Sequence, residues 1–253
     1  MLNDVIKISK EAGEIIREGF RKNFSVEFKT NHTNLVTEID KKSEKAIISY
    51  IKKEFPAHGI IAEESGNENN KAEFVWVIDP IDGTTNFAHG LPIFSVSIGI
   101  QQKGETICGV VYDVMMDRVY AAEAGGGAYC NDRKMAVSAN DNLSYSLLVT
   151  GFPYDVQENP GRTVDYFASF LQNSRAIRRL GSAALDLCYV ADGVFDGFWE
   201  VSLHPWDVCA GKLLVEEAGG LVTDFSGIKR DIFYKQTLAT NGKVHDQMMK
   251  ILK

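Results

Sequence analysis

Apolar residues recur every three or four positions through the first twenty residues of the chain, and charged residues fill the positions between them. This spacing is typical of an amphipathic helix, which we expect over residues 2–20. A second helix is predicted for residues 38–55, because Ile47 and Ile51 share one helical face and Pro56 follows the apolar pattern. The pattern therefore predicts two helices that each have one face to bury.

The middle and the second half of the chain show two different rhythms. Short apolar runs separated by Gly, Pro and Asn predict a mostly antiparallel sheet with strands at residues 60–62, 74–78, 94–100, 107–112 and 118–121. Apolar stretches of helical length then alternate with short runs, which is typical of layered α/β folds. There we expect helices at residues 162–172, 182–191, 207–218 and 244–251, and strands at residues 197–201, 221–224 and 238–239.

This order of elements predicts an α/β (α+β) protein built from two halves. Residues 1–145 would form an α+β half with an antiparallel sheet, and residues 146–253 a smaller mixed α/β half. A glycine-rich stretch at residues 125–127 and a loop at residues 151–160 indicate a seam, although neither resembles a long flexible linker. We therefore expect one compact unit of two fused halves.

Composition and charge exclude several classes of protein. The chain has 253 residues, of which 45% are hydrophobic and 24% charged, so disorder, collagen and coiled coil are excluded. The formal net charge is −7, which leaves no bulk positive field to bind nucleic acid or an anionic membrane. If the substrate is an anion, a bound metal ion is the obvious way to reverse the local charge.

The N-terminal sequence, the lack of a long apolar segment and the cysteines favour a soluble cytoplasmic protein. The first residues carry charges such as Asp4 and Lys7 and lack the uninterrupted apolar region of a signal peptide. No segment approaches the roughly 18 apolar residues that span a bilayer. The four cysteines are far apart and form no CxxC pair, so we expect buried free thiols in a reducing compartment.

The densest chemical pattern is the segment DPIDGTTN at residues 79–86, which directly follows an expected strand. Pro80 lacks an N–H group, so we expect the chain to leave the sheet there, with Asp79 at the edge and Asp82 in the turn. Both carboxylates could then face one point, and the small residues that follow could direct N–H groups at a phosphate. An Asx-turn with a helix cap would use the same residue types.

Further acidic residues lie at the ends of other expected elements. Glu63 and Glu64 end a short strand, and Asp207 stands at the start of a helix. Each alone is typical of surface charge or of an ordinary helix cap. If the fold brings Glu63, Asp79, Asp82 and Asp207 together, however, their repulsion would raise their pKa values unless cations neutralise them. Oxygen ligands without His or Cys suit Mg²⁺.

Together these segments resemble the inositol monophosphatase family of lithium-sensitive, Mg²⁺-dependent phosphatases, in its bacterial branch. The matching stretches are Glu63-Glu64, residues 79–90, Trp206-Asp207 and residues 216–220, in the family's order and at compatible spacing across nearly the whole chain. The resemblance implies an αβαβα arrangement, a small phosphorylated polyol or sugar as substrate, and a homodimer. It implies hydrolysis of myo-inositol monophosphate to myo-inositol and phosphate by a metal-activated water.

The resemblance also implies roles for the acidic residues, with two or three Mg²⁺ ions per active site. One ion would be held by Glu63, Asp79 and the backbone carbonyl of Ile81, and a second by Asp79, Asp82 and Asp207. Glu64 would touch a third, weaker ion only through water. Thr84 would orient the attacking water together with Asp40, which alone is typical of a helix start. Lys29 resembles a lysine on a flexible loop near the metals, with an exposed surface charge as the alternative.

Substrate binding is expected from both halves, mainly from the second. The residues that the resemblance assigns to it are Asp82, Gly83, Thr84, Thr85, Gly181, Ser182, Ala183, Glu200 and Arg178. Glu200 would accept hydrogen bonds from a polyol. Arg178 resembles one of an arginine pair that reaches the substrate or a partner subunit, and a plain surface role is equally open. His89 and His204 fit structural hydrogen bonding, because the proposed chemistry has no task for an imidazole.

Three rival functions remain. Phosphatases of the same superfamily act on fructose 1,6-bisphosphate or 3′-phosphoadenosine 5′-phosphate, and the metal centre cannot separate these from the inositol branch. An aspartyl-phosphate mechanism wants D-x-D-G-T, whereas Asp79 and Asp82 are three residues apart. The third rival is a non-catalytic binding or regulatory protein on the same fold.

Overall fold

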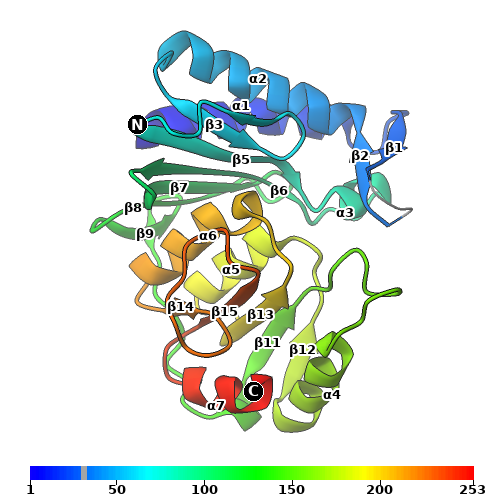
Figure 1. The fold of residues 1–253 in the computed structure, drawn as a ribbon, viewed down its shortest axis with the longest axis vertical. Helices are drawn as coiled ribbons and strands as arrows, with labels where there is room; N and C mark the ends of the chain where they lie inside the picture. Colours follow the sequence, from blue (N-terminus) through cyan, green and yellow to red (C-terminus); the bar gives the residue numbers. More distant parts are fainter. Residues whose placement is uncertain (30–32) are drawn as a thin grey trace.

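The protein is described by a computed structural model that covers residues 1–29 and 33–253. Helices and sheets alternate in five layers along its long axis (Figure 1). The outer layers and the middle layer are helical, with α1 (Leu2–Gly19) and α2 (Glu38–Glu54) at one end, α5 (Ala183–Ala191) and α6 (Pro205–Glu217) between the sheets, and α4 (Thr163–Asn173) and α7 (His245–Leu252) at the other end. This is the expected αβαβα arrangement.

The first sheet has eight strands in the order β10-β9-β8-β7-β6-β5-β3-β4 and is antiparallel except where β3 runs parallel to β5. Because helices cover both of its faces, the central strand β5 is buried along almost its whole length. The strands are β3 (Gly59–Ala62), β4 (Gly66–Glu68), β5 (Phe74–Asp82), β6 (Ser95–Gln102), β7 (Glu105–Asp113), β8 (Arg118–Glu123), β9 (Gly127–Cys130) and β10 (Arg133–Lys134).

The second sheet has five strands in the order β12-β11-β13-β15-β14 and is mixed, as expected. β11 runs parallel to β12 and β13, whereas β15 is antiparallel to β13 and β14. A separate two-stranded sheet lies beside α2. The strands are β1 (Val26–Phe28) and β2 (Leu35–Thr37) in the small sheet, and β11 (Leu147–Thr150), β12 (Ala176–Arg178), β13 (Gly197–Val201), β14 (Leu221–Thr223) and β15 (Gln236–Thr240) in the second sheet.

The expected break of the first sheet at Pro80 is wrong. Strand β5 continues through the proline to Asp82, and the ladder with β6 shifts register there, since Asp79 pairs with Ser97 and Asp82 with Ser95. Three steps on β5 therefore oppose two on β6, which is a bulge, and a bulge accommodates a residue that has no N–H to donate. Asp82 consequently lies at the end of the strand, not in a turn beyond it.

The glycine-rich stretch at residues 125–127 forms the turn of the hairpin between β8 and β9, so it connects two strands of one sheet. The backbone N–H groups of Gly125 and Gly127 donate to the carboxylate of Glu217 in α6, at 2.7 and 2.8 Å. The turn is therefore pinned to a helix of the second half in space, while the chain crosses to the second sheet only after β10.

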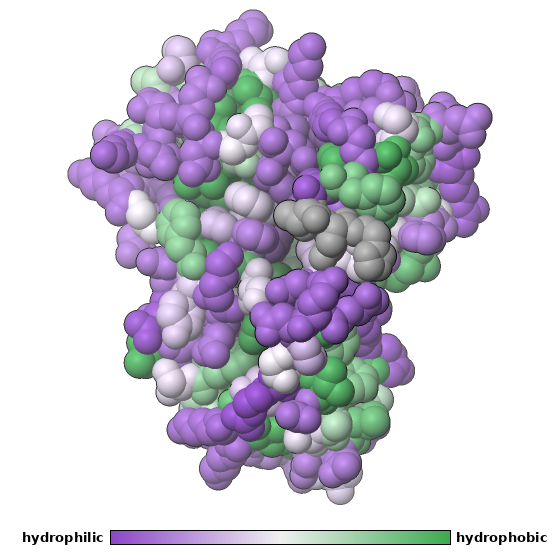
Figure 2. Space-filling view, turned by 45° about the vertical axis from the view of Figure 1, so that its right-hand side comes forward, coloured by the Kyte–Doolittle hydropathy of each residue, from purple (hydrophilic) through white to green (hydrophobic). Residues whose placement is uncertain are grey.

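The core follows the layers. One apolar cluster lies between α1, α2 and the first sheet, a second surrounds α5 and α6, and a third lies beneath α4 and α7. All four cysteines are buried free thiols, as expected. On the face that Figure 2 shows, apolar side chains appear as scattered areas within a mainly hydrophilic surface. None of the helices in the described residues is long and apolar enough to cross a membrane.

Candidate active site

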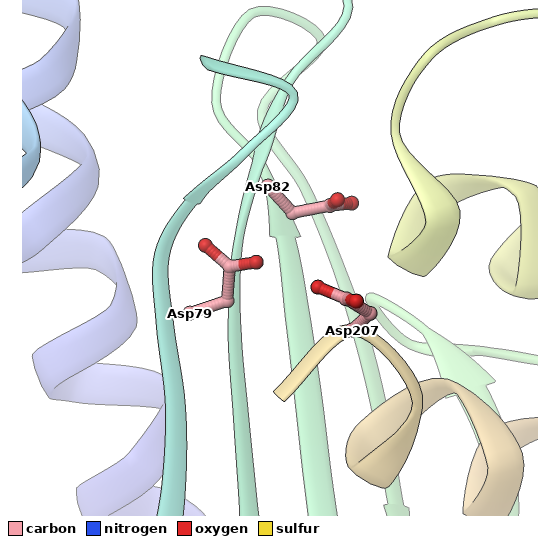
Figure 3. Close-up of side chains that lie close together, drawn as sticks. All are labelled: Asp79, Asp82 and Asp207. Atoms are coloured by element: carbon pink, nitrogen blue, oxygen red, sulfur yellow. The ribbon is translucent and has the colours of Figure 1, made fainter. Parts of the chain in front are cut away.

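Three aspartates from two distant parts of the chain meet at the junction of the two halves. Asp79 and Asp82 come from the end of β5, and Asp207 from the first turn of α6 (Figure 3). One carboxylate oxygen from each lies within 4.8 Å of those of the other two. Asp79 and Asp82 are buried, with 3% and 7% of their surface exposed. The structure therefore brings together three of the predicted metal ligands.

Backbone groups fix the orientation of each aspartate. The N–H of Ile81 donates to Asp79 Oδ1 at 3.1 Å. The carboxylate of Asp82 accepts the N–H groups of Ala183 and Ala184, at 3.2 and 2.8 Å, together with the hydroxyl of Ser182. Asp82 therefore sits on the N-terminus of α5, where free N–H groups and the helix dipole favour a negative charge.

Asp207 is held by a helix cap, which is the ordinary role that its position predicts. It is the third residue of α6, and its carboxylate accepts the N–H of His204 at 2.6 Å. The ring of His204 stacks on that of Trp206 with centroids 4.8 Å apart. The carboxylate of Asp207 can therefore cap α6 and also belong to the aspartate cluster.

Glu63 and Glu64 occupy the turn after β3, as expected, and a buried glutamate orients them. The two carboxylate oxygens of Glu44 in α2 accept the N–H groups of Glu64 and Ser65, at 2.8 and 2.9 Å. Sequence reasoning missed Glu44, although an acidic residue on the apolar face of an amphipathic helix could have indicated it. Lys29 Nζ donates to Glu63 at 2.7 Å and also to Glu64. Residues 30–32 of the segment that follows Lys29 lie outside the described residues.

The acidic groups raise one another's pKa values. Burial and the charges of Glu63 and of the neighbouring aspartates raise the pKa values of Asp79 and Asp207 well above the ordinary range. Burial also raises the pKa of Asp82 to about 6, although its three hydrogen bonds from the start of α5 oppose the shift. Burial, followed by the charge of Glu63, raises the pKa of Glu64 to about 7, despite the ion pair with Lys29.

The crowding of these carboxylates indicates whether a metal ion fits between them. Close, buried carboxylates with raised pKa values are stabilised as anions by a multivalent cation. The donors are carboxylates and the carbonyl of Ile81, which lines the same cavity, and this all-oxygen set suits Mg²⁺. The residues present therefore fit divalent metal ions held against the end of β5.

Thr84 and Asp40 also meet at this site. Thr84 begins α3 (Thr84–Ala88), and its hydroxyl lies 2.8 Å from Asp40 Oδ1 and 2.9 Å from the carbonyl of Ile81. Asp40 forms a capping box with Thr37, whose N–H donates to Asp40 Oδ2 at 2.9 Å. Burial raises the pKa of Asp40, and the hydrogen bonds from Thr37 and Thr84 oppose the shift. Its helix-start role and its contact with Thr84 coexist.

A cavity of about 440 Å³ extends from the aspartates toward the second sheet. The substrate-binding candidates that line it are Asp82, Gly83, Thr84, Thr85, Gly181, Ser182, Ala183 and Glu200. Gly83 has a left-handed φ of 100°, and a Cβ there would lie 3.0 Å from the carbonyl of Ile93 and 3.1 Å from that of Gly181. The two halves approach so closely at this point that a side chain would separate them.

Arg178 does not join the other candidates. Its side chain is exposed and donates to the neighbouring carbonyl of Ile177 at 3.0 Å, whereas the next residue, Arg179, lines the cavity. Asp186 and Tyr154 line it as well and were missed, because no local pattern marks them. His204 lines the rim, and burial lowers its pKa, while His89 is exposed at the end of α3.

Comparison with known proteins places this geometry in a class. The model of the Inositol monophosphatase family matches residues 1–253. An inositol-1-monophosphatase of Mesorhizobium japonicum is 36% identical over 256 residues, which cover 100% of this chain and 96% of that protein. A Nus factor SuhB of Pasteurella multocida is 46% identical over 229 residues, which cover 90% of this chain and 86% of that protein.

The fold agrees with these matches. The structure of an inositol monophosphatase from Anabaena (Nostoc) superposes with a TM-score of 0.90 and 42% identity, covering 99% of this chain and 94% of that one. The layered fold and its acidic centre thus define a metal-dependent phosphatase. The chain belongs to the inositol monophosphatase family.

Proposed function

We propose that the protein is a Mg²⁺-dependent phosphomonoesterase that releases myo-inositol and phosphate from inositol monophosphate by direct attack of water. The observation that carries this proposal is the approach of Asp79, Asp82 and Asp207 to within 4.8 Å of one another at one end of the cavity. Such a cluster attracts cations, and a phosphate monoester with about two negative charges needs cations to enter an acidic site.

The chain's own ligands support two main ion positions. Glu63, Asp79 and the carbonyl of Ile81 would hold one ion, and Asp79, Asp82 and Asp207 a second. Glu63, with Glu64 acting through water, would hold a third more weakly. When bound, Mg²⁺ supplies Lewis-acid chemistry, because it polarises phosphate oxygens, lowers the pKa of water and stabilises the leaving alkoxide.

Thr84 and Asp40 are suited to orient the attacking water. The Thr84 hydroxyl has one proton and two acceptors within 2.9 Å, so donation to Asp40 leaves its lone pairs free to accept from a water in the cavity. Asp40 is fixed by Thr37 and can take up a proton because burial raises its pKa. No covalent nucleophile is required for this route.

The remaining cavity residues would bind different parts of the substrate. Gly83, Thr84 and Thr85 would bind the phosphate through the start of α3, beside Asp82. Gly181, Ser182, Ala183 and Glu200 would face the polyol. Arg178, which is exposed, would serve a partner subunit in the proposed homodimer, and Lys29 would stay near the metal end through its contacts with Glu63 and Glu64.

A regulatory role is the second candidate. Several relatives carry the printed name Nus factor SuhB, among them the Pasteurella multocida protein described above. A binding role for this chain could exist beside catalysis, since every acidic residue that catalysis requires is present. Fructose 1,6-bisphosphate and 3′-phosphoadenosine 5′-phosphate remain alternative substrates for the same centre.

The test is initial phosphate release from inositol 1-phosphate, fructose 1,6-bisphosphate and 3′-phosphoadenosine 5′-phosphate, with Mg²⁺ titrated from zero and with added Li⁺. We expect a Mg²⁺-dependent, Li⁺-sensitive rate that favours inositol 1-phosphate. If the enzyme preferred another ester, the proposed metal centre would stand, but the proposed roles of Glu200 and residues 181–183 in binding inositol would be wrong. No release from any ester by folded protein would leave the regulatory role.

A further inference from the structure

A second pair of acids lines the cavity besides the aspartate cluster. Glu200 from β13 and Asp186 from the first turn of α5 both line it, with 9% and 1% of their surface exposed. The charge of Glu200 acts on Asp186, since burial and then this charge raise the pKa of Asp186. Burial raises the pKa of Glu200 to about 8. The proposed function uses Glu200 and leaves Asp186 without a task.

Neither carboxyl group is held by a hydrogen bond from the described residues. Asp186 Oδ1 is fully buried and has no partner among them. A buried polar group without a partner destabilises the fold, so native structures rarely keep one unless a ligand, a water or an ion completes it. A ligand that hydrogen-bonds to Asp186 and Glu200 would therefore satisfy the two carboxyl groups.

Asp186 is not needed to cap its helix. The N–H groups of Ala183 and Ala184 donate to Asp82, and that of Leu185 faces the Ser182 hydroxyl at 3.4 Å. The start of α5 is thus satisfied before Asp186 is reached. The stabilisation that an acidic residue in a first helical turn gains from the helix dipole is small beside the cost of burying its charge.

The surroundings of the pair suit a polyol. A Cβ on Gly151 would lie 2.2 Å from Glu200 Oε2, so the backbone of the loop after β11 packs directly against that carboxyl group. Arg179 lines the same space, and its positive charge lowers the pKa values of both acids without a hydrogen bond to either. Carboxyl oxygens and a guanidinium group together can bind adjacent hydroxyls, which both donate and accept.

We propose that Asp186 is a substrate-binding residue that determines specificity, and that it forms with Glu200 a two-carboxyl subsite for neighbouring hydroxyl groups of a polyol leaving group. This inference rests on the proposed function, which it deepens by adding Asp186. The subsite selects esters by their hydroxyl groups, because an ester without hydroxyls leaves both carboxyl groups buried and unpaired.

The test compares Asp186→Leu, which keeps the size of the side chain and removes its polar atoms, with Asp186→Asn, which keeps a hydrogen-bonding oxygen. For the leucine variant we expect KM for inositol 1-phosphate to rise at least 10-fold more than KM for ethyl phosphate. The asparagine variant should recover most of that loss. Inhibition by inorganic phosphate, which contacts the metal end, should change far less than KM in both variants.

Ser9→Ala is the matched control, because Ser9 Oγ in α1 is also buried without a partner and lies outside the cavity. It should leave both KM values within twofold of wild type. Equal KM changes for the two esters in the leucine variant would show a structural role and overturn the inference. If that variant does not fold, Asp186→Ser, whose side chain is too short to reach the ligand, is measured on the same esters.

Direct binding separates this inference from the proposed function. Calorimetric titration of myo-inositol into the Mg²⁺-loaded protein with phosphate present requires no turnover. Binding that weakens at least 10-fold in Asp186→Leu supports the subsite even if wild-type protein releases no phosphate, an outcome that would overturn the proposed function alone. Unchanged binding in the variant would overturn the subsite alone.

Discussion

The acids that line the cavity form two groups of opposite character. At the proposed metal end, Asp79, Asp82 and Asp207 each accept backbone N–H groups that fix their direction, and they crowd to within 4.8 Å of one another. At the proposed polyol end, Glu200 and Asp186 accept no hydrogen bond from the described residues. Orientation is therefore built into one end and left to the ligand at the other.

This difference separates two chemical tasks. Ligands of a small cation must converge on one point with little freedom, so the protein fixes them before the cation arrives. Groups that select a polyol gain discrimination when they remain unpaired without the right ligand. We expect substitutions at the metal end to affect the rate, and those at the polyol end to affect KM and stability.

The largest effect should come from Asp79→Asn. Asp79 is the proposed bridge between two ions, so loss of its charge weakens both positions. We expect kcat at saturating substrate to fall roughly 1000-fold, with a higher Mg²⁺ requirement, measured as phosphate release across a Mg²⁺ titration. Asp113→Asn is the control, since Asp113 is also buried at a strand end. If Asp79→Asn turned over substrate at nearly the wild-type rate, Asp79 would not be a metal ligand.

Thr84→Val should come next. The variant keeps the shape of the side chain and loses the hydroxyl that contacts Asp40 at 2.8 Å. We expect kcat to fall about 100-fold with KM little changed, because orientation of water matters in the transition state. Thr84→Ser restores the hydroxyl and should recover most of the rate. If valine and serine variants behave alike in steady-state kinetics, Thr84 does not orient the water.

A smaller effect is expected for Glu44→Gln, which tests whether fixed orientation matters at the metal end. One of the two N–H groups at the turn of Glu64 and Ser65 would then face an amide NH₂. The Mg²⁺ concentration for half-maximal rate should rise about 10-fold, with little change in kcat at saturating Mg²⁺. Glu38→Gln is the control, because Glu38 lies on the same helix with 41% of its side chain exposed. An unchanged Mg²⁺ titration would contradict the positioning role.

The smallest effect concerns stability, and it tests whether the buried carboxyl group of Glu200 is unpaired. The pKa of Glu200 is about 8 in the folded protein against 4.5 ordinarily, so the folded state binds more protons between these values. Stability should therefore fall as the pH rises from about 4.5 to 8. Glu200→Gln removes this loss, and we expect it to match wild type near pH 5.

At pH 8 the same variant should unfold with a free energy on the order of 2 kcal/mol higher than wild type, or roughly 6 °C in Tm. The measurement is thermal unfolding without Mg²⁺ at several pH values. Glu105→Gln, at an exposed position, should reproduce the wild-type profile. A variant that is less stable than wild type at pH 8 would mean that Glu200 is paired as a carboxylate.

Much of the fold could be predicted because its elements follow local rules. The first two helices and β13 agree with the sequence pattern within one or two residues, since amphipathic spacing and Thr37 as a cap act locally. Several strands of two to four residues were missed, because so few residues carry little periodicity; these are β1, β2, β4, β9, β10, β11 and β12. The continuation of β5 through Pro80 depends on its partner strand, which no local pattern reveals.

The candidate site divides in the same way. Asp79, Asp82 and Asp207 stand at element ends, where the sequence marks them. Asp186 looks like any residue of a helical turn, and only the cavity and the nearby Glu200 give it significance. Arg178 and Arg179 are adjacent and identical in type, so only the direction of the backbone after β12 decides which one lines the cavity.

The distance in sequence between the acidic residues has a consequence for biosynthesis. Asp79 and Asp82 leave the ribosome more than a hundred residues before Asp207, and α5, whose first N–H groups hold Asp82, also comes late. A nascent chain therefore carries Asp79 and Asp82, which repel each other, before Asp207 and the start of α5 have been synthesised. Contacts between residues this far apart in sequence also form slowly. The proposed metal centre is complete only when the second half has folded onto the first, so we expect a chain truncated before Asp207 to have no phosphatase activity.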